Sequence, residues 1–146
     1  MDKKIPCLDL QGQHKQVKQE IFEAFERVYE KTAFSGGPFV EEFENAFAKY
    51  IGSTYAAGVS NGTIALHLAM LALEIGHSDE VIIPANTFIA TAWGVSHAGA
   101  TPVFVDCDAD SWEIDASKIE AAITPKTKAI IGVHLYGQPF DVDAVK

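Results

Sequence analysis

The N-terminal part of the chain has apolar side chains at every third or fourth position, with lysine, glutamine and glutamate between them. The apolar positions are Val17, Ile21, Phe25 and Val28. This period matches one face of an α-helix and predicts an amphipathic helix over about residues 12–32. Ser35–Pro38 breaks the pattern, and a second amphipathic helix ending at Gly52 is expected after it.

Further along, short apolar runs alternate with helical patterns. Strands are expected at residues 55–59, 81–83, 102–105 and 128–133. Helices are expected at 64–73, from Asn86 or Thr87 to about Ala98, from Asp115 through Ala122, and opening near residue 141. The first of these helices is apolar nearly all round, which indicates a buried helix. Alternation of this kind predicts an α/β fold with a mostly parallel sheet and flanking helices on both faces.

The segment Ser60–Thr63 lies between an expected strand and an expected helix. Ligands of parallel α/β sheets bind at the carboxyl ends of strands, where a helix N-terminus offers unpaired N–H groups to a phosphate. Asn61, Gly62 and Thr63 are therefore candidate anion-binding residues: Gly62 allows close approach and Thr63 adds a hydroxyl. An ordinary capped turn and a glycosylation sequon are the alternative interpretations.

Phe88 follows the next expected strand, so it belongs to the same rim of the sheet. A flat aromatic ring at this place could stack on a planar heteroaromatic ligand, and the alternative is a core residue. The five histidines have no common spacing that indicates a metal site. His67 is expected to be a core or partly exposed residue, whereas His134 either faces the ligand crevice or has a structural role.

The composition is that of a globular protein, with 146 residues, 48% of them hydrophobic and 21% charged. The formal net charge of −9 disfavours nucleic acids and anionic membranes as partners, because both carry negative charge. The sequence shows no signal peptide pattern and no apolar stretch long enough to cross a bilayer. We therefore expect a cytoplasmic protein in which Cys7 and Cys107 are reduced, structural thiols.

Several segments occur in an order and spacing that are specific when taken together. They are IP and LDL within 5–10, SGGP at 35–38, VSNGT at 59–63, DEVIIP at 79–84, TPKTKAI at 124–130 and HLYGQP at 134–139. This series resembles the DegT/StrS family of nucleotide-sugar aminotransferases, which use pyridoxal 5'-phosphate (PLP). The resemblance covers nearly the whole chain.

The resemblance implies the large domain of an aspartate aminotransferase-like PLP-dependent transferase. Residues 1–146 would be the N-terminal part of that PLP-binding domain, truncated before the lysine that forms the Schiff base. It also implies PLP as cofactor and a homodimer with shared active sites. The positions matching Gly62 and Thr63 bind the PLP phosphate in this family, and the position matching Phe88 stacks on the pyridine ring. With Asn61, these are the expected cofactor-binding residues, and the segment 35–37 is expected near the active-site entrance.

Some features depart from the family pattern. Ser78 stands where a glycine is usual, Gly132 replaces a proline, and Phe140 replaces a small residue. The family's catalytic lysine and the acidic partner of the pyridine nitrogen both follow the matched region, so no residue here is assigned a catalytic role. The missing later strands would separate strand 55–59 from the other three. We therefore expect the isolated chain to repack its sheet, to pair with a second copy or to be marginally stable.

Three functions follow from these features. In the first, the complete protein transfers an amino group from glutamate or glutamine to a keto sugar linked to a nucleotide. In the second, the chain binds PLP or sugar phosphates without catalysis, and in the third it pairs with a full-length homologue through its N-terminal helices. Dehydration of the sugar, another PLP reaction of this family, is an alternative to amino transfer. The residue that distinguishes the two reactions lies downstream of the matched region.

Overall fold

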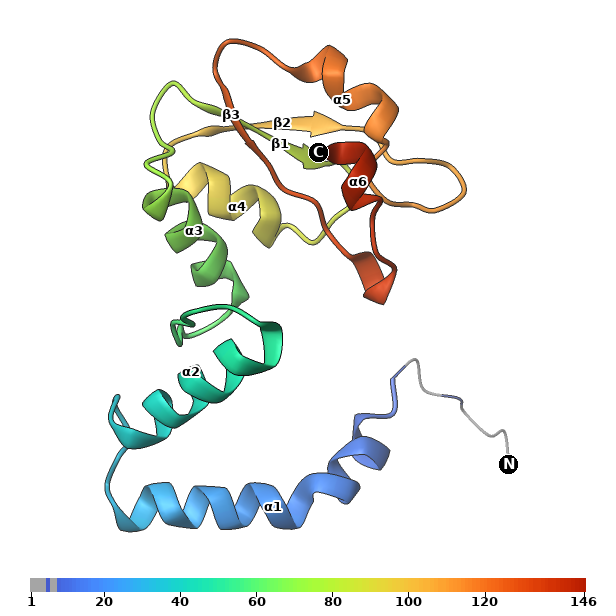
Figure 1. Cartoon of the computed structure of the whole chain (residues 1–146). Helices are drawn as coiled ribbons and strands as arrows, with labels where there is room; N and C mark the ends of the chain where they lie inside the picture. Colours follow the sequence, from blue (N-terminus) through green and yellow to red (C-terminus); the bar gives the residue numbers. More distant parts are fainter. Residues whose placement is uncertain (1–4, 6–7) are drawn as a thin grey trace. The chain divides into compact units, whose positions relative to one another are not determined.

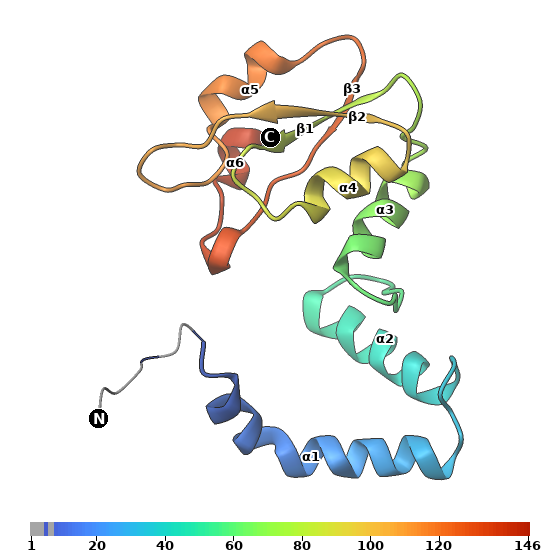
Figure 2. The same ribbon diagram turned by 180° about the vertical axis from the view of Figure 1, so that it is seen from behind.

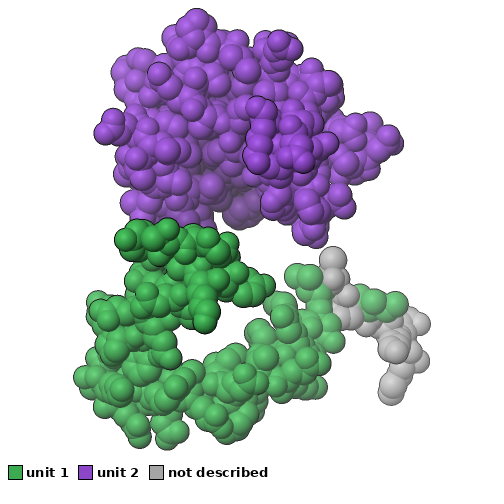
Figure 3. All heavy atoms as spheres, in the orientation of Figure 1, with its two compact units in different colours: residues 1–58 green, residues 59–146 purple. Residues whose placement is uncertain are grey.

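The computed structural model describes residue 5 and residues 8–146 (Figure 1). The chain divides into two compact units, residues 1–58 and 59–146, which are coloured separately in Figure 3. The expected reduced thiol of Cys7 lies outside the described residues, and the expectation that the N-terminus carries no signal peptide concerns a segment that is described only in part. Within the described part, no helix is both long and apolar enough to cross a membrane.

The first unit contains two helices, α1 (Leu10–Glu30) and α2 (Pro38–Ile51), as the apolar period predicts. Helix α1 begins two residues before the expected start because the Asp9 side chain accepts a hydrogen bond from Gly12 N (2.9 Å) and caps it. Helix α2 ends at Gly52, whose φ of 74° lies in the left-handed region that glycine tolerates. Local sequence chemistry therefore sets the start of α1 and the end of α2.

The prediction of a strand at residues 55–59 is wrong. This segment forms no strand, and Tyr55 is exposed. Two hydrogen bonds hold its backbone within the first unit: Gly58 N donates to Glu44 Oε1 (2.6 Å), and Tyr55 O accepts from Ser53 Oγ (2.8 Å). A strand is stabilised by hydrogen bonds to a neighbour, and no described residue pairs with this segment. The apolar run alone could not show that a partner strand was lacking.

The second unit contains a three-stranded parallel sheet in the order β2–β1–β3 (Figures 1 and 2). The strands are β1 (Glu80–Pro84), β2 (Thr101–Val105) and β3 (Thr127–Ile130). The third strand was predicted over residues 128–133 and ends earlier, at Ile130, although Ile131 N still donates to Ile82 O of β1 (2.8 Å). Only the central strand is buried on both faces, which explains its continuous apolar run.

Alternate residues of β1 build two separate cores. The helices of this unit are α3 (Gly62–Ala72), α4 (Ala90–His97), α5 (Ala116–Ala122), the short 3₁₀ helix η1 (Leu135–Gly137) and α6 (Val142–Val145). Val81 and Ile83 pack with residues of α3 and α4, whereas Ile82 packs with residues of α5. Successive side chains of a strand point to opposite faces, so the sheet has helices on both sides, as Figure 2 also shows.

Two helix predictions need correction. Helix α4 begins at Ala90 without a side-chain cap, because the Thr87 hydroxyl instead bonds the Thr91 hydroxyl (2.9 Å). Helix α3 is not a buried helix, since Met70 is its one buried residue. Leu68 and Leu71 on the same helix are nearly half exposed.

Candidate functional site

The turn before α3 is held by Asn61. Its Oδ1 atom accepts from Ile64 N (3.0 Å) and its backbone oxygen accepts from Ala65 N (3.0 Å). Its Nδ2 atom donates to Ser60 Oγ (3.3 Å). Asn61 is thus the N-cap of α3, and its side-chain amide fixes the direction in which the helix begins.

The cap leaves the next two N–H groups free. Among the described residues, no acceptor is recorded for the backbone nitrogen of Gly62 or of Thr63, which occupy the first turn of α3. A Cβ placed on Gly62 would have no neighbour within 4 Å, so the backbone faces open space. Free N–H groups and the positive end of the helix dipole suit an anion such as a phosphate.

A cavity of about 710 Å³ opens beside this helix end and reaches Phe88. Its wall contains Asn61, Gly62, Thr63 and Phe88, so the structure brings all four predicted cofactor-binding residues to one place. The side chain of Phe88 is 70% exposed, which shows that the core interpretation of this residue is wrong. Phe88 lies two residues before the first residue of α4.

The other residues of the cavity wall are Ala65, Leu66, Ala69, Ala90 and Thr91, which the sequence analysis did not single out. The first three lie three, four and seven positions after Gly62, so helical periodicity applied to α3 would have found them. No charged side chain lines the cavity. Attraction of an anion therefore depends on the N–H groups, the helix dipole and the Thr63 hydroxyl, and the aromatic and aliphatic wall suits a flat ring.

The histidines take structural positions. His134 Nδ1 accepts from Phe140 N (3.3 Å), and the two rings stack with centroids 4.9 Å apart. His67 on α3 meets His97 on α4 edge to face, with ring centroids 5.8 Å apart. Within the described residues, no group of three or more potential ligands could hold a metal ion. Cys107, half-buried, is a free thiol.

Comparisons with known proteins place this fold in a defined class. The model of the DegT/DnrJ/EryC1/StrS aminotransferase family matches residues 15–146. The chain is 55% identical over 111 residues to GDP-perosamine synthase of Caulobacter vibrioides, covering 76% of the chain and 30% of that protein. It is 46% identical over 141 residues to dTDP-3-amino-3,6-dideoxy-alpha-D-galactopyranose transaminase of Aneurinibacillus thermoaerophilus, covering 97% of the chain and 39% of that protein.

The chain is also similar to a solved structure. The crystal structure of NtdA from Bacillus subtilis, with the cofactor PMP (pyridoxamine phosphate) bound, matches 99% of the chain with a TM-score of 0.93 at 36% identity. The chain covers 34% of NtdA. The fold is thus part of an α/β PLP aminotransferase. The chain belongs to the DegT/DnrJ/EryC1/StrS aminotransferase family, and it spans between about a third and two fifths of the length of most relatives it matches.

Proposed function

We propose that the complete protein is a PLP-dependent aminotransferase that acts on a keto sugar linked to a nucleotide. The observation that carries this proposal is the cavity that joins the free helix end at Gly62 and Thr63 to the exposed ring of Phe88. In this proposal, residues 1–146 are the N-terminal part of the PLP-binding domain, and the groups that form and break bonds lie elsewhere in the protein.

The residues of the cavity have separate tasks in this proposal. The N–H groups of Gly62 and Thr63, together with the Thr63 hydroxyl, donate to the cofactor phosphate. Phe88 stacks on the pyridine ring and keeps one face of it from water. Asn61 caps the start of α3 and leaves the N–H groups of Gly62 and Thr63 available to the cofactor. When bound, PLP supplies an electron-withdrawing ring that stabilises negative charge at the substrate carbon.

The names of two relatives support the proposed substrate class, since one is a GDP-perosamine synthase and the other a dTDP-sugar transaminase. Glutamate or glutamine is the proposed amino donor, and the cytoplasm is the proposed location. A homodimer is proposed because α1 presents exposed aromatic rings. Phe22, Phe25 and Tyr29 line a groove of about 380 Å³ on this helix and are each more than half exposed.

Isotope transfer by the native protein tests the proposal. The protein is isolated from its source, its intact mass is measured, and it is incubated with PLP, ¹⁵N-glutamate and a nucleotide-linked keto sugar. Appearance of ¹⁵N on the sugar supports the proposed reaction, and loss of a sugar hydroxyl without nitrogen uptake would assign the dehydration instead. A native mass equal to that of this chain, without nitrogen transfer, overturns the enzymatic function. Co-purification of a longer subunit would favour the interaction function.

A further inference from the structure

Two histidine rings meet on helices α3 and α4, which lie side by side in the second unit (Figures 1 and 2). His67 lies in the middle of α3 and His97 in the last turn of α4. Their ring centroids are 5.8 Å apart, and the ring planes are inclined by 73°. Of the five histidines of the chain, these are the two whose rings meet in the part that the structure describes.

Close packing of the two helices brings these rings together. Gly94 of α4 faces Leu66 of α3, and a β-carbon on Gly94 would lie 2.6 Å from the β-carbon of Leu66. Because glycine has no side chain, the two helix backbones can approach closely at this point. His67 directly follows Leu66, and His97 follows Gly94 by about one helical turn. The contact between the rings is therefore set by the packing of the helices.

The buried core beside the pair fixes both helices. Met70 of α3 and Val95 of α4 are almost fully buried and belong to one apolar cluster with Val81 of the central strand. The two imidazole rings nevertheless remain accessible, since His67 is half-buried and His97 is exposed. The fold thus holds two imidazoles next to each other at the surface of a packed pair of helices.

Neither ring has another recorded polar partner. Among the described residues, no hydrogen bond or ion pair is recorded for the side chain of His67 or His97, whereas His134 Nδ1 accepts from Phe140 N. A neutral imidazole has one nitrogen with a free lone pair, and this is the atom that binds a metal ion. Two such nitrogens are therefore available to one shared ion.

The separation of the rings fits a shared metal ion. Zinc binds an imidazole nitrogen at about 2.0–2.1 Å, and near-tetrahedral angles then place the centres of two bound rings roughly 5–6 Å apart. The observed separation of 5.8 Å lies in this range. The rings meet edge to face, so binding requires the exposed His97 ring to turn about its Cβ–Cγ bond, a torsion with broad energy wells.

Electrostatics at this place favours a cation. His97 lies in the last turn of α4, where the carbonyl end of the helix dipole attracts positive charge. The formal net charge of −9 adds to this attraction. Mg²⁺ and Ca²⁺ prefer oxygen ligands, whereas imidazole nitrogens suit zinc, copper and nickel ions. The two nitrogens thus indicate a divalent transition-metal ion, with water at its other coordination positions.

We propose that His67 and His97 form a two-histidine site for a divalent transition-metal ion, for which Zn²⁺ is the probe. The bound ion joins α3 to α4, the two helices that also contribute to the wall of the first cavity, around Thr63 and Phe88. This site is independent of the proposed aminotransferase function, because it requires neither the cofactor nor a sugar substrate.

Calorimetric titration of the full chain with Zn²⁺ tests the site. Mg²⁺ is kept in excess, so that exposed carboxylates are occupied by a cation that prefers oxygen. The expected result is one saturable site that His97→Ala and His67→Gln each weaken by roughly tenfold or more, because either change removes one of the two chelating nitrogens. His67→Gln keeps a polar side chain at this half-buried position, so the helix pair should stay folded.

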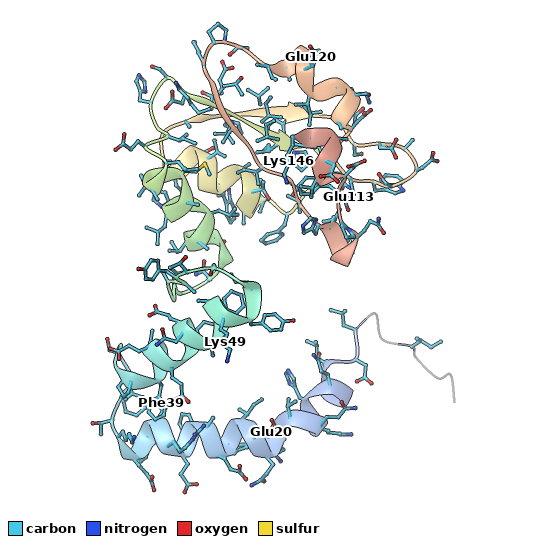
Figure 4. All side chains as sticks on the ribbon, in the orientation of Figure 1. Glu20, Phe39, Lys49, Glu113, Glu120 and Lys146 are labelled. Carbon is cyan, nitrogen blue, oxygen red and sulfur yellow. The ribbon has the colours of Figure 1, made fainter. Side chains whose placement is uncertain are left out.

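Three matched variants should bind Zn²⁺ as the parent does. His14→Ala removes an exposed histidine of α1, Cys107→Ser removes the half-buried thiol, and Glu120→Gln removes an exposed carboxylate of α5 (Figure 4). Zinc should also raise the melting temperature of the parent but not that of His97→Ala, because the ion joins the two helices only in the folded chain.

The opposite results would overturn the proposal. Absence of saturable binding, or binding that neither His97→Ala nor His67→Gln weakens, would leave the two rings with a packing role only. Loss of zinc binding in Cys107→Ser, with binding retained in both histidine variants, would assign the ion to the thiol instead.

Discussion

The aromatic ring of Phe140 occupies the space that a β-carbon on Gly132 would need. The two residues are eight positions apart, and both depart from the pattern of the family that the chain resembles. The ring also packs with the core that contains Ile82 and stacks on His134. The two departures therefore compensate each other, since the missing side chain at Gly132 makes room for the larger one at Phe140.

This pair predicts a non-additive effect on stability. Gly132→Ala should lower the free energy of unfolding by about 1–3 kcal/mol, because the new methyl group overlaps the Phe140 ring. In Gly132→Ala with Phe140→Ala, the overlap is gone, so the combined loss should be smaller than the sum of the two single losses. Urea denaturation of the four proteins measures this. Additive losses would show that the residues do not compensate.

Ser78 is a strained residue, with a φ of 74° in the left-handed region. It stands where a glycine is usual in the family, and it is exposed. Ser78→Gly should raise the free energy of unfolding by about 0.5–1 kcal/mol, because glycine adopts this backbone without steric cost. The matched control is Ser96→Gly, which places glycine in α4 and should destabilise by a similar amount. A loss of stability in Ser78→Gly would contradict this account.

The N-cap of α5 links stability to pH. The Ser117 hydroxyl donates to Asp115 Oδ1 (2.6 Å), Lys118 Nζ lies 3.1 Å from Asp115 Oδ2, and these contacts lower the pKa of Asp115. A lowered pKa means that the fold favours the carboxylate. The Asp115 carboxylate stabilises the fold fully above the usual aspartate pKa of about 3.9. This stabilisation is lost as the pH falls through the lowered pKa that Asp115 has in the folded protein.

The variant Asp115→Asn isolates this contribution, since asparagine caps a helix as well as aspartate does. Its free energy of unfolding should fall less steeply than that of the parent as the pH drops below about 4. Part of the slope should remain, because N–H donation from Ser111 also lowers the pKa of Asp108. Denaturation of both proteins at several pH values measures this. If the free energy of unfolding falls equally steeply with pH in Asp115→Asn and in the parent, Asp115 does not contribute to the pH dependence.

Two substitutions of Asn61 separate folding from ligand binding. Asn61→Asp keeps the cap on Ile64 N, so stability should change by less than about 0.5 kcal/mol. It also places a negative charge beside the proposed phosphate site, and its affinity for a phosphorylated cofactor should fall. Asn61→Ala should lose about 1 kcal/mol of stability without that repulsion. Equal cofactor affinity in Asn61→Asp and the parent, measured by calorimetry, would argue against a phosphate at this helix end.

The sequence predicted those features that depend on short stretches of chain. Capping residues and glycines mark the ends of α2, α5 and α6, and the apolar run at 81–83 predicted the buried central strand. The four residues around the first cavity could be named because parallel strands bring their carboxyl ends to one rim.

Features that depend on distant partners could not be predicted in this way. Residues 55–59 have the composition of a strand, but a strand also needs a neighbour. The burial of α3 likewise depends on what covers it, and its leucines are partly exposed. Nor did the sequence indicate that Glu113 is buried, because burial of a charged side chain depends on residues that only the fold brings around it.

The central claim is that the N-terminus of α3 at Gly62 and Thr63, together with Phe88, forms the cofactor-binding site. It is tested most directly by calorimetric titration of the full chain with PMP. PMP carries an amine in place of the PLP aldehyde, so it cannot react with surface lysines. Matched controls for Thr63→Ala and Phe88→Ala are Thr54→Ala and Phe104→Ala, which alter exposed residues outside the cavity.

The account predicts saturable binding that is weakened roughly tenfold or more by Thr63→Ala and by Phe88→Ala, as expected for a lost phosphate contact and a lost stacking face. Thr54→Ala and Phe104→Ala should bind as the parent does. Absence of binding by the folded parent, or binding that none of the four substitutions changes, would contradict the assignment of the cofactor site to these residues.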